Sequence, residues 1–98
     1  MTYSEERAGR KRLARAAAEI ARVEAETRMP VSRRDLADLF DHLDEALPEY
    51  GCKHSLDLTK TFLTSRSLDA ESVVPWLGEY GGFCDCEVLA NVEDVWPR

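Results

Sequence analysis

Apolar residues follow a helical period most clearly between residues 32 and 48. They occur at i, i+3, i+4, i+7 and i+11, as Leu36, Leu39, Phe40, Leu43 and Leu47. This spacing places them on one face and predicts an amphipathic helix. Ser32 is suited to cap its N-terminus, and Pro48 is expected to end it.

A second helix is predicted over residues 4–27, with a narrow apolar stripe and many alanines. Leu13, Ala17, Ile20 and Glu24 follow the helical spacing, with Val23 beside them, and Met29-Pro30 ends the helix. Because alanine favours helix but buries little area, this helix is expected to dock on something, in this chain or another. We therefore divide the chain into a basic, Ala-rich helical extension (1–30) and a zinc-binding α+β domain (31–98).

Two short helices and a strand are predicted in the second half. The helices cover residues 57–66 and a segment that ends at Gly81-Gly82. The second helix is capped by either Asp69 or Ser72. We prefer the later start, or a kink, because a start at Asp69 would place Pro75 in the helix interior.

Alternation from Phe83 to Glu87 predicts the strand, with residues 50–56 as its antiparallel partner. The expected fold class is thus α+β. It comprises two N-terminal helices, followed by a compact zinc-bound unit of two short helices and a small antiparallel β pairing.

All three cysteines and one of the two histidines occur in pairs spaced i, i+2, as Cys52 with His54 and Cys84 with Cys86. In extended segments such pairs project to one face, so adjacent segments would bring four donors to one point. Three thiolates and one imidazole form a tetrahedral zinc set, and four protein ligands leave no open position. We expect one structural Zn²⁺; the competing interpretation is three buried thiols without a metal. Asp57 and Asp85 are candidates to accept the other ring N–H of His54.

The strings "GCKHSL" and "GGFCDCEVLANVEDVW", with "FL" and "WL" helices between them, resemble a small bacterial family catalogued as domain of unknown function 2695. The resemblance covers about residues 35–96 and leaves the basic N-terminal helix outside. It implies a bacterial protein and shared ligand positions at Cys52, His54, Cys84 and Cys86. The resemblance does not indicate which activity, if any, the protein has.

Charge is unevenly distributed along the 98 residues, whose formal net charge is −6. Residues 1–34 hold nine Lys or Arg against five Asp or Glu, whereas residues 35–98 hold four against fourteen. The acidic part would repel phosphate, so nucleic acid is expected only at the basic arm of the N-terminal helix: Arg7, Arg10, Lys11, Arg12 and Arg15. The chain has no long apolar run and no signal-peptide pattern, which predicts a cytoplasmic protein without membrane contact.

We expect a zinc-stabilised module without catalytic activity, whose partner is another protein. Its recognition surface would be the Ala-rich helix, which is also compatible with a homodimer, or an acidic helix face formed by Asp38, Asp41, Asp44 and Glu45. The alternative is a metal- or redox-responsive regulator that contacts nucleic acid through the basic helix. An enzyme is disfavoured but stays open, with a Cys86–His54 pair or Glu87 as its chemical groups.

Overall fold

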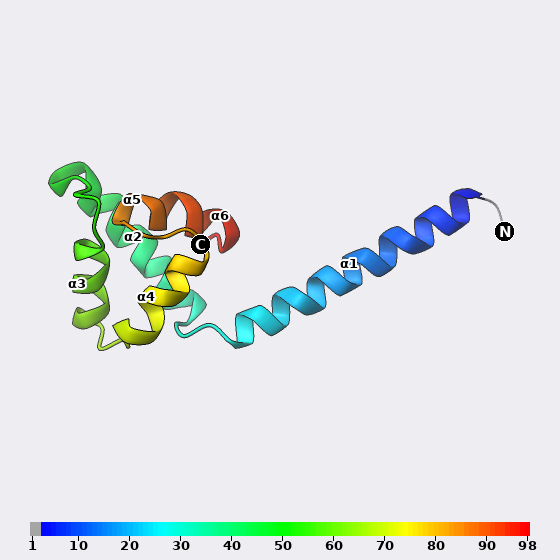
Figure 1. Cartoon of the computed structure of the whole chain (residues 1–98), viewed down its shortest axis with the longest axis horizontal. Helices are drawn as coiled ribbons and strands as arrows, with labels where there is room; N and C mark the ends of the chain where they lie inside the picture. Colours follow the sequence, from blue (N-terminus) through cyan, green and yellow to red (C-terminus); the bar gives the residue numbers. More distant parts are fainter. Residues whose placement is uncertain (1–2) are drawn as a thin grey trace.

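One long helix, α1 (Tyr3–Thr27), leads into a cluster of shorter helices in the computed structural model (Figure 1). The structure describes the backbone of residues 3–98 and the side chains of residues 15–98. Because α1 projects from the cluster, the molecule extends 60 Å along its longest axis and only 25 by 19 Å across. The helix predicted over residues 4–27 is confirmed.

The amphipathic helix predicted from the apolar period is α2 (Arg33–Tyr50). The hydroxyl of Ser32 caps it by accepting the N–H of Asp35 at 3.0 Å. The prediction that Pro48 ends the helix is wrong, since the helix continues to Tyr50. Because Pro48 lies in the last turn of α2, the N–H that proline lacks removes only one hydrogen bond of the helix. The chain leaves the helix at Gly51, whose φ of 71° favours glycine.

The next two helices are α3 (Asp57–Ser65) and α4 (Ala70–Glu79). Asp69 caps α4: its carboxylate accepts the backbone N–H two residues on at 3.1 Å and the hydroxyl of Ser72 at 2.7 Å. The preferred start at Ser72 is therefore wrong. Pro75 lies inside the helix, on its exposed side, where water can hydrogen-bond the carbonyl that proline leaves unpaired.

The glycine pair predicted to stop α4 does so through two hydrogen bonds. Gly81 has a φ of 82°, and its N–H donates to the carbonyl of Gly78 at 3.1 Å. The N–H of Gly82 reaches the carbonyl of Leu77 at 2.9 Å. This is the Schellman arrangement, in which a left-handed glycine satisfies the last carbonyls of the helix. The predicted stop is confirmed.

The expected α+β fold is wrong, because residues 3–98 contain helices and turns but no β-strand. The predicted strand instead begins α5 (Asp85–Glu87), which continues into a π-helical turn, η1 (Val88–Val92), and α6 (Glu93–Val95). Its supposed partner, residues 50–56, consists of the last residue of α2 followed by an irregular loop over residues 51–56. The reason lies beyond residue 87: Val88, Val92 and Trp96 recur every four residues, and all three are buried on one helical face.

The core lies where α2 packs against α3, α5 and η1, and α3 packs against α4. Its largest fully buried apolar side chains come from all of these elements except α5: Phe40, Leu36, Leu39, Leu43, Leu63, Leu77, Val73, Val88 and Val92. In this described part of the chain, no helix has both the length and the apolar character that crossing a membrane requires.

Trp96 closes the core from the C-terminal side and is only 3% exposed. Its ring packs against Trp76 and Tyr80, with centroid distances of 6.2 and 5.9 Å. The guanidinium groups of Arg22 from α1 and Arg33 from α2 lie over it at 5.1 and 5.4 Å. Stacked cations are attracted by the negative face of an indole ring. The indole therefore joins the C-terminal segment to α1, α2 and α4.

We predict that Gly82→Ala destabilises the fold, because a Cβ at this position would lie 2.8 Å from a methyl group of Val92 and 3.1 Å from the carbonyl oxygen of Leu77. Overpacking of this kind costs about 1–3 kcal/mol of unfolding free energy. Urea unfolding followed by circular dichroism measures the loss.

Gly78→Ala is the matched control, because its Cβ would meet only the exposed ring of Phe83, at 3.2 Å. That ring can turn aside, and alanine favours helix over glycine, so stability should stay level or rise. Equal losses in the two variants would contradict the assignment of tight packing to Gly82.

Candidate functional site

The two cysteine-bearing segments lie side by side at one end of the cluster. Gly51 turns the chain out of α2 into the loop that carries Cys52 and His54. Cys84 takes an extended conformation as the N-terminal cap residue of α5. The N–H of Asp85 donates to the carbonyl of Ser55 at 2.9 Å, which ties the second segment to the loop.

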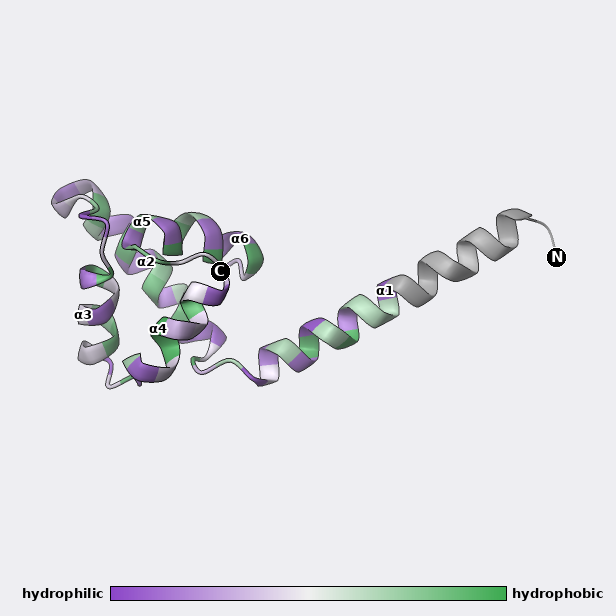
Figure 2. Cartoon of the chain, viewed as in Figure 1, coloured by the Kyte–Doolittle hydropathy of each residue, from purple (hydrophilic) through white to green (hydrophobic). Residues whose placement is uncertain are grey.

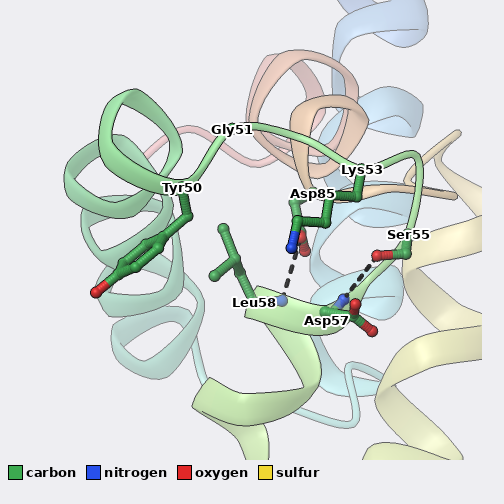
Figure 3. Close-up of a pocket in the computed structure, with 7 residues that line it drawn as sticks. All are labelled: Tyr50, Gly51, Lys53, Ser55, Asp57, Leu58 and Asp85. Atoms are coloured by element: carbon green, nitrogen blue, oxygen red, sulfur yellow. Dashed lines mark hydrogen bonds between the residues drawn. The ribbon is translucent and has the colours of Figure 1, made fainter.

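The carboxylate of Asp85 makes a second connection, to the start of α3. It accepts the N–H of Leu58 at 3.1 Å (Figure 3), the N–H of Thr59 at 3.0 Å and the hydroxyl of Thr59 at 2.7 Å. The residue that precedes α3, Leu56, has no capping side chain. Asp85 thus acts as the helix cap from a distant part of the chain. Although Asp85 is only 2% exposed, three hydrogen bonds and the positive end of the helix dipole compensate its charge.

Cys52 is the most acidic of the three thiols. The backbone N–H and the side chain of Cys86 hydrogen-bond its sulfur, and the backbone N–H of His54 adds a further bond, so that its pKa falls from 9.0 to about 7. Hydrogen bonds to the charged form stabilise a thiolate. A contact from Cys84 also lowers this pKa. Both of the other cysteines therefore lie near enough to Cys52 to stabilise its thiolate.

The other two thiols are shifted in the opposite direction. The backbone N–H of Glu87 favours the Cys84 thiolate, but burial and the side chains of Cys52 and Glu87 outweigh it and raise the Cys84 pKa. The Cys84 thiol lies 3.3 Å from the Glu87 carboxylate. The hydrogen bond to Cys52, followed by burial, raises the pKa of Cys86 to about 11. The cluster is thus arranged as one favoured thiolate beside two protonated thiols.

His54 does not complete this cluster in the structure. Its backbone N–H serves Cys52, while the residue itself is exposed and has a φ of 56°. Among the side chains of residues 15–98, no three His, Cys, Asp or Glu groups are arranged around a common metal position. The zinc-bound unit expected from paired strands is therefore not formed. The segments that carry the three thiols lie next to each other, but a loop and a helix start bring them together instead of a β pairing.

The two carboxylates proposed to support the histidine lie in different settings. Asp57 is exposed in the first turn of α3, where its N–H faces the Ser55 hydroxyl at 3.4 Å. The oxygens of Asp85 are used by the cap. A cavity of about 130 Å³ opens beside these groups (Figure 3). Its lining comes from the end of α2, the loop, α3 and α5: Tyr50, Gly51, Lys53, Ser55, Asp57, Leu58 and Asp85.

The acidic face proposed for a partner is largely occupied by arginines of the same chain. Asp38 forms an ion pair with Arg66 at 3.0 Å. Asp41 and Asp44 both bind the guanidinium of Arg98, which also pairs with Glu93. These carboxylates raise the pKa of Arg98 further above its usual range. The remaining member of the face, Glu45, is exposed.

The basic arm is described only in part. Arg15 is exposed on α1. The side chains of Arg7, Arg10, Lys11 and Arg12 lie outside the described residues.

Sequence reasoning missed the capping role of Asp85, the contact of Glu87 with Cys84 and the Arg98 clamp. The third residue from a cysteine is a neighbour once the segment is helical, so a helical assignment of residues 84–87 would have found Glu87. The other two contacts join residues 26 and 57 positions apart, and no local pattern marks them.

Comparison with known proteins gives one family. Residues 39–91 match the model described as "Protein of unknown function (DUF2695)", which confirms the resemblance seen in the sequence. Uncharacterised proteins of Mycobacterium bovis and Mycobacterium tuberculosis are 32% identical over 93 residues, or 95% of this chain and 94% of each relative. That match includes most of α1, which the family model leaves out. No solved structure matches the chain significantly.

We predict that Asp85→Ala lowers the unfolding free energy by about 2–5 kcal/mol, because it leaves two backbone N–H groups and one hydroxyl at the start of α3 without an acceptor. Asp85→Asn should lose less, since one side-chain oxygen is kept. Chemical denaturation of both variants measures the effect.

Asp57→Asn is the control, because it removes an exposed carboxylate from the first turn of the same helix. It should cost less than about 1 kcal/mol through the helix dipole alone. A loss as large as that of Asp85→Ala would show that charge near the helix end, and not the buried cap, is what matters.

Proposed function

We propose that this chain, which belongs to the family described as protein of unknown function DUF2695, is a small zinc-stabilised interaction module of the bacterial cytoplasm. In this proposal Cys52, Cys84, Cys86 and His54 hold one structural Zn²⁺. The module catalyses no reaction of its own and acts by binding another protein.

The observation that carries the proposal is the meeting of all three cysteines. The side chains of Cys84 and Cys86 both lower the pKa of Cys52, which indicates that the three cysteines lie near one another, and backbone N–H groups of Cys86 and Glu87 favour the thiolates of Cys52 and Cys84. N–H groups in this position stabilise thiolates, which are the form that binds metal. Three buried thiols without a function would have no need of such donors. Cys86 is moreover exposed, unlike a cysteine that serves only as a core residue.

The donor set fits zinc. Three sulfurs and one imidazole nitrogen match the tetrahedral preference of the ion, and His54 lies two residues from Cys52 in the same loop. The loop is held at the next residue, Ser55, by the N–H of Asp85. A turn of the exposed imidazole toward the thiols is the step that this proposal requires.

Zinc would supply folding free energy and not chemistry. Four protein ligands fill the coordination sphere and leave no position for a reactive water. Structural zinc contributes on the order of 10–16 kcal/mol in small domains. One ligand segment follows α2 and the other begins α5, so the ion would link the loop after α2 to the start of α5.

The binding surface is better sought on α1 than on the acidic face of α2. Asp38, Asp41 and Asp44 already bind arginines of this chain, so a basic partner would have to displace them. The described part of α1 instead exposes apolar side chains: Ile20 is 60% and Val23 59% exposed. Exposed apolar groups that share one helix face mark an interaction site.

We predict that native protein contains one equivalent of zinc and that Cys86→Ser, at the exposed thiol, abolishes tight binding by removing one of four ligands. Elemental analysis gives the stoichiometry, and competition with a chelator gives the affinity. Chelation of the wild-type protein should also lower its melting temperature. Zinc-free native protein that does not take up the ion would contradict the proposal. Equal zinc affinity in the variant would contradict it too.

The two histidines of the chain provide a separate prediction. His54→Ala should weaken zinc binding, because it removes the only nitrogen ligand of the proposed site. His42→Ala is the matched control: this residue packs against the ring of Phe62, with centroids 5.4 Å apart, on another face of the domain. It should lose some stability but keep its zinc affinity. If His54→Ala binds zinc as tightly as His42→Ala does, the fourth ligand is wrongly assigned.

A further inference from the structure

The apolar stripe of α1 has no partner in the described part of the chain. Ala16, Ile20 and Val23 lie on one side of the helix, at spacings of four and three residues, and all are exposed. In Figure 2 apolar residues appear on α1 well away from the helical cluster. A stripe of this kind is normally buried against another element.

The cluster cannot cover this stripe, because α1 docks through its opposite side. Arg22 stacks on Trp96 and donates to the carbonyl of Val95 at 3.1 Å. Ala25, three residues on, packs against the core. At 100° per residue these positions face away from Ile20 and Val23. The docking of α1 therefore holds the stripe outward.

The sequence of α1 has the spacing of a two-stranded coiled coil. Residues at alternating intervals of three and four form one seam: Leu13, Ala16, Ile20, Val23 and Thr27. Apolar residues at this 3.5-residue period pair with an equivalent seam on another helix. The seam is short and small, which suits a second copy of the same chain better than burial in a large core.

The charges beside the seam distinguish the two possible orientations. An antiparallel pair that sets Ala16 beside Ile20 of the second copy also sets position 10 near position 24, and position 12 near position 26. Both contacts join an arginine to a glutamate, Arg10 to Glu24 and Arg12 to Glu26, and the twofold symmetry of the pair produces each contact twice. A parallel pair would instead set Glu19 beside Glu24 twice. Flanking charges of opposite sign select partner and orientation.

One repulsive contact remains in the antiparallel arrangement, where the Glu19 residues of the two copies approach at the twofold axis. Glu26 is shared with Arg33 of its own copy, but the two Arg10–Glu24 pairs alone outweigh this contact. The parallel arrangement offsets its Glu–Glu contacts only by Glu5 against Arg10, so its charges cancel.

We propose that α1 is a homodimerisation helix, which pairs antiparallel with α1 of a second copy through the seam of Ala16, Ile20 and Val23. The second copy is thus the protein partner of the exposed apolar face of α1, so this inference rests on the proposed binding role of that face and not on the proposed zinc site. A helix of 25 residues is roughly 37 Å long at 1.5 Å per residue, so the two helical clusters lie at opposite ends of the pair. The isologous contact closes after two copies.

The first test is the oligomeric state of the full chain by sedimentation equilibrium over a range of concentrations. Wild type should form dimers, and Ile20→Glu with Val23→Glu should raise the dissociation constant about tenfold or more, because charges would be buried in the seam. Ala18→Glu with Ala21→Glu is the matched control. It adds the same charge to the same helix, off the seam, and should dimerise within about twofold of wild type.

Two outcomes would overturn the proposal. One is a wild-type protein that stays monomeric at all concentrations, whether or not the basic end of α1 binds DNA. The other is a dimer that the two double variants weaken equally. Circular dichroism of each variant shows that α1 remains helical, since glutamate is a good helix former.

The second test addresses orientation through the charges at positions 10 and 24. Arg10→Glu alone and Glu24→Lys alone each place like charges opposite one another in an antiparallel pair, so each variant should dimerise less tightly than wild type. A mixture of the two restores opposite charges at both positions and should form a heterodimer preferentially. A mixture that associates no better than either variant alone would exclude the antiparallel register. Glu26 is left unchanged because it already pairs with Arg33 at 3.4 Å.

Discussion

The buried carboxylate of Asp85 is the interaction on which the arrangement of the second half depends. A charge removed from water is costly unless donors surround it, and here the first N–H groups of α3 and a threonine hydroxyl do so. In return, α3 receives the cap that its own preceding residue does not provide. Because Asp85 lies between Cys84 and Cys86, this cap also sets where two of the three thiols stand relative to the loop of Cys52.

The C-terminal segment provides the second constraint on the fold. Trp96 is buried between α1, α2 and α4, and Arg98 binds Asp41 and Asp44 on the outer face of α2. The Arg98 side chain thereby offsets part of the negative charge on this face, and α1 is held by the stacking of Arg22 on the indole. Surface charge counted from a sequence therefore overstates what a partner would meet, whereas the apolar stripe of α1 stays outside.

Most helices could be predicted because their signals are local. The period of α2, the cap at Ser32 and the glycine stop after α4 each act within a few residues, so tertiary contacts had little to change. The candidate site was predictable only as a set of residues. Pairing in sequence singled out Cys52, Cys84 and Cys86, whose segments do lie side by side, but the strand geometry invoked for them was wrong, and in the described residues His54 forms no metal-binding group with the thiols.

The sequence by itself determined which segments are amphipathic helices, where two of them are capped or stopped, and which side chains have the chemistry to bind a metal. Tertiary structure decided the conformation of residues 83–95, since alternation over five residues is compatible with a strand or a helix. Burial of Val88, Val92 and Trp96 on one face, together with the capping of α3 by Asp85, selected the helix. Tertiary structure also decided which of the many acidic residues is buried. A carboxylate caps a helix only where folding places it in front of the unpaired N–H groups at the start of that helix.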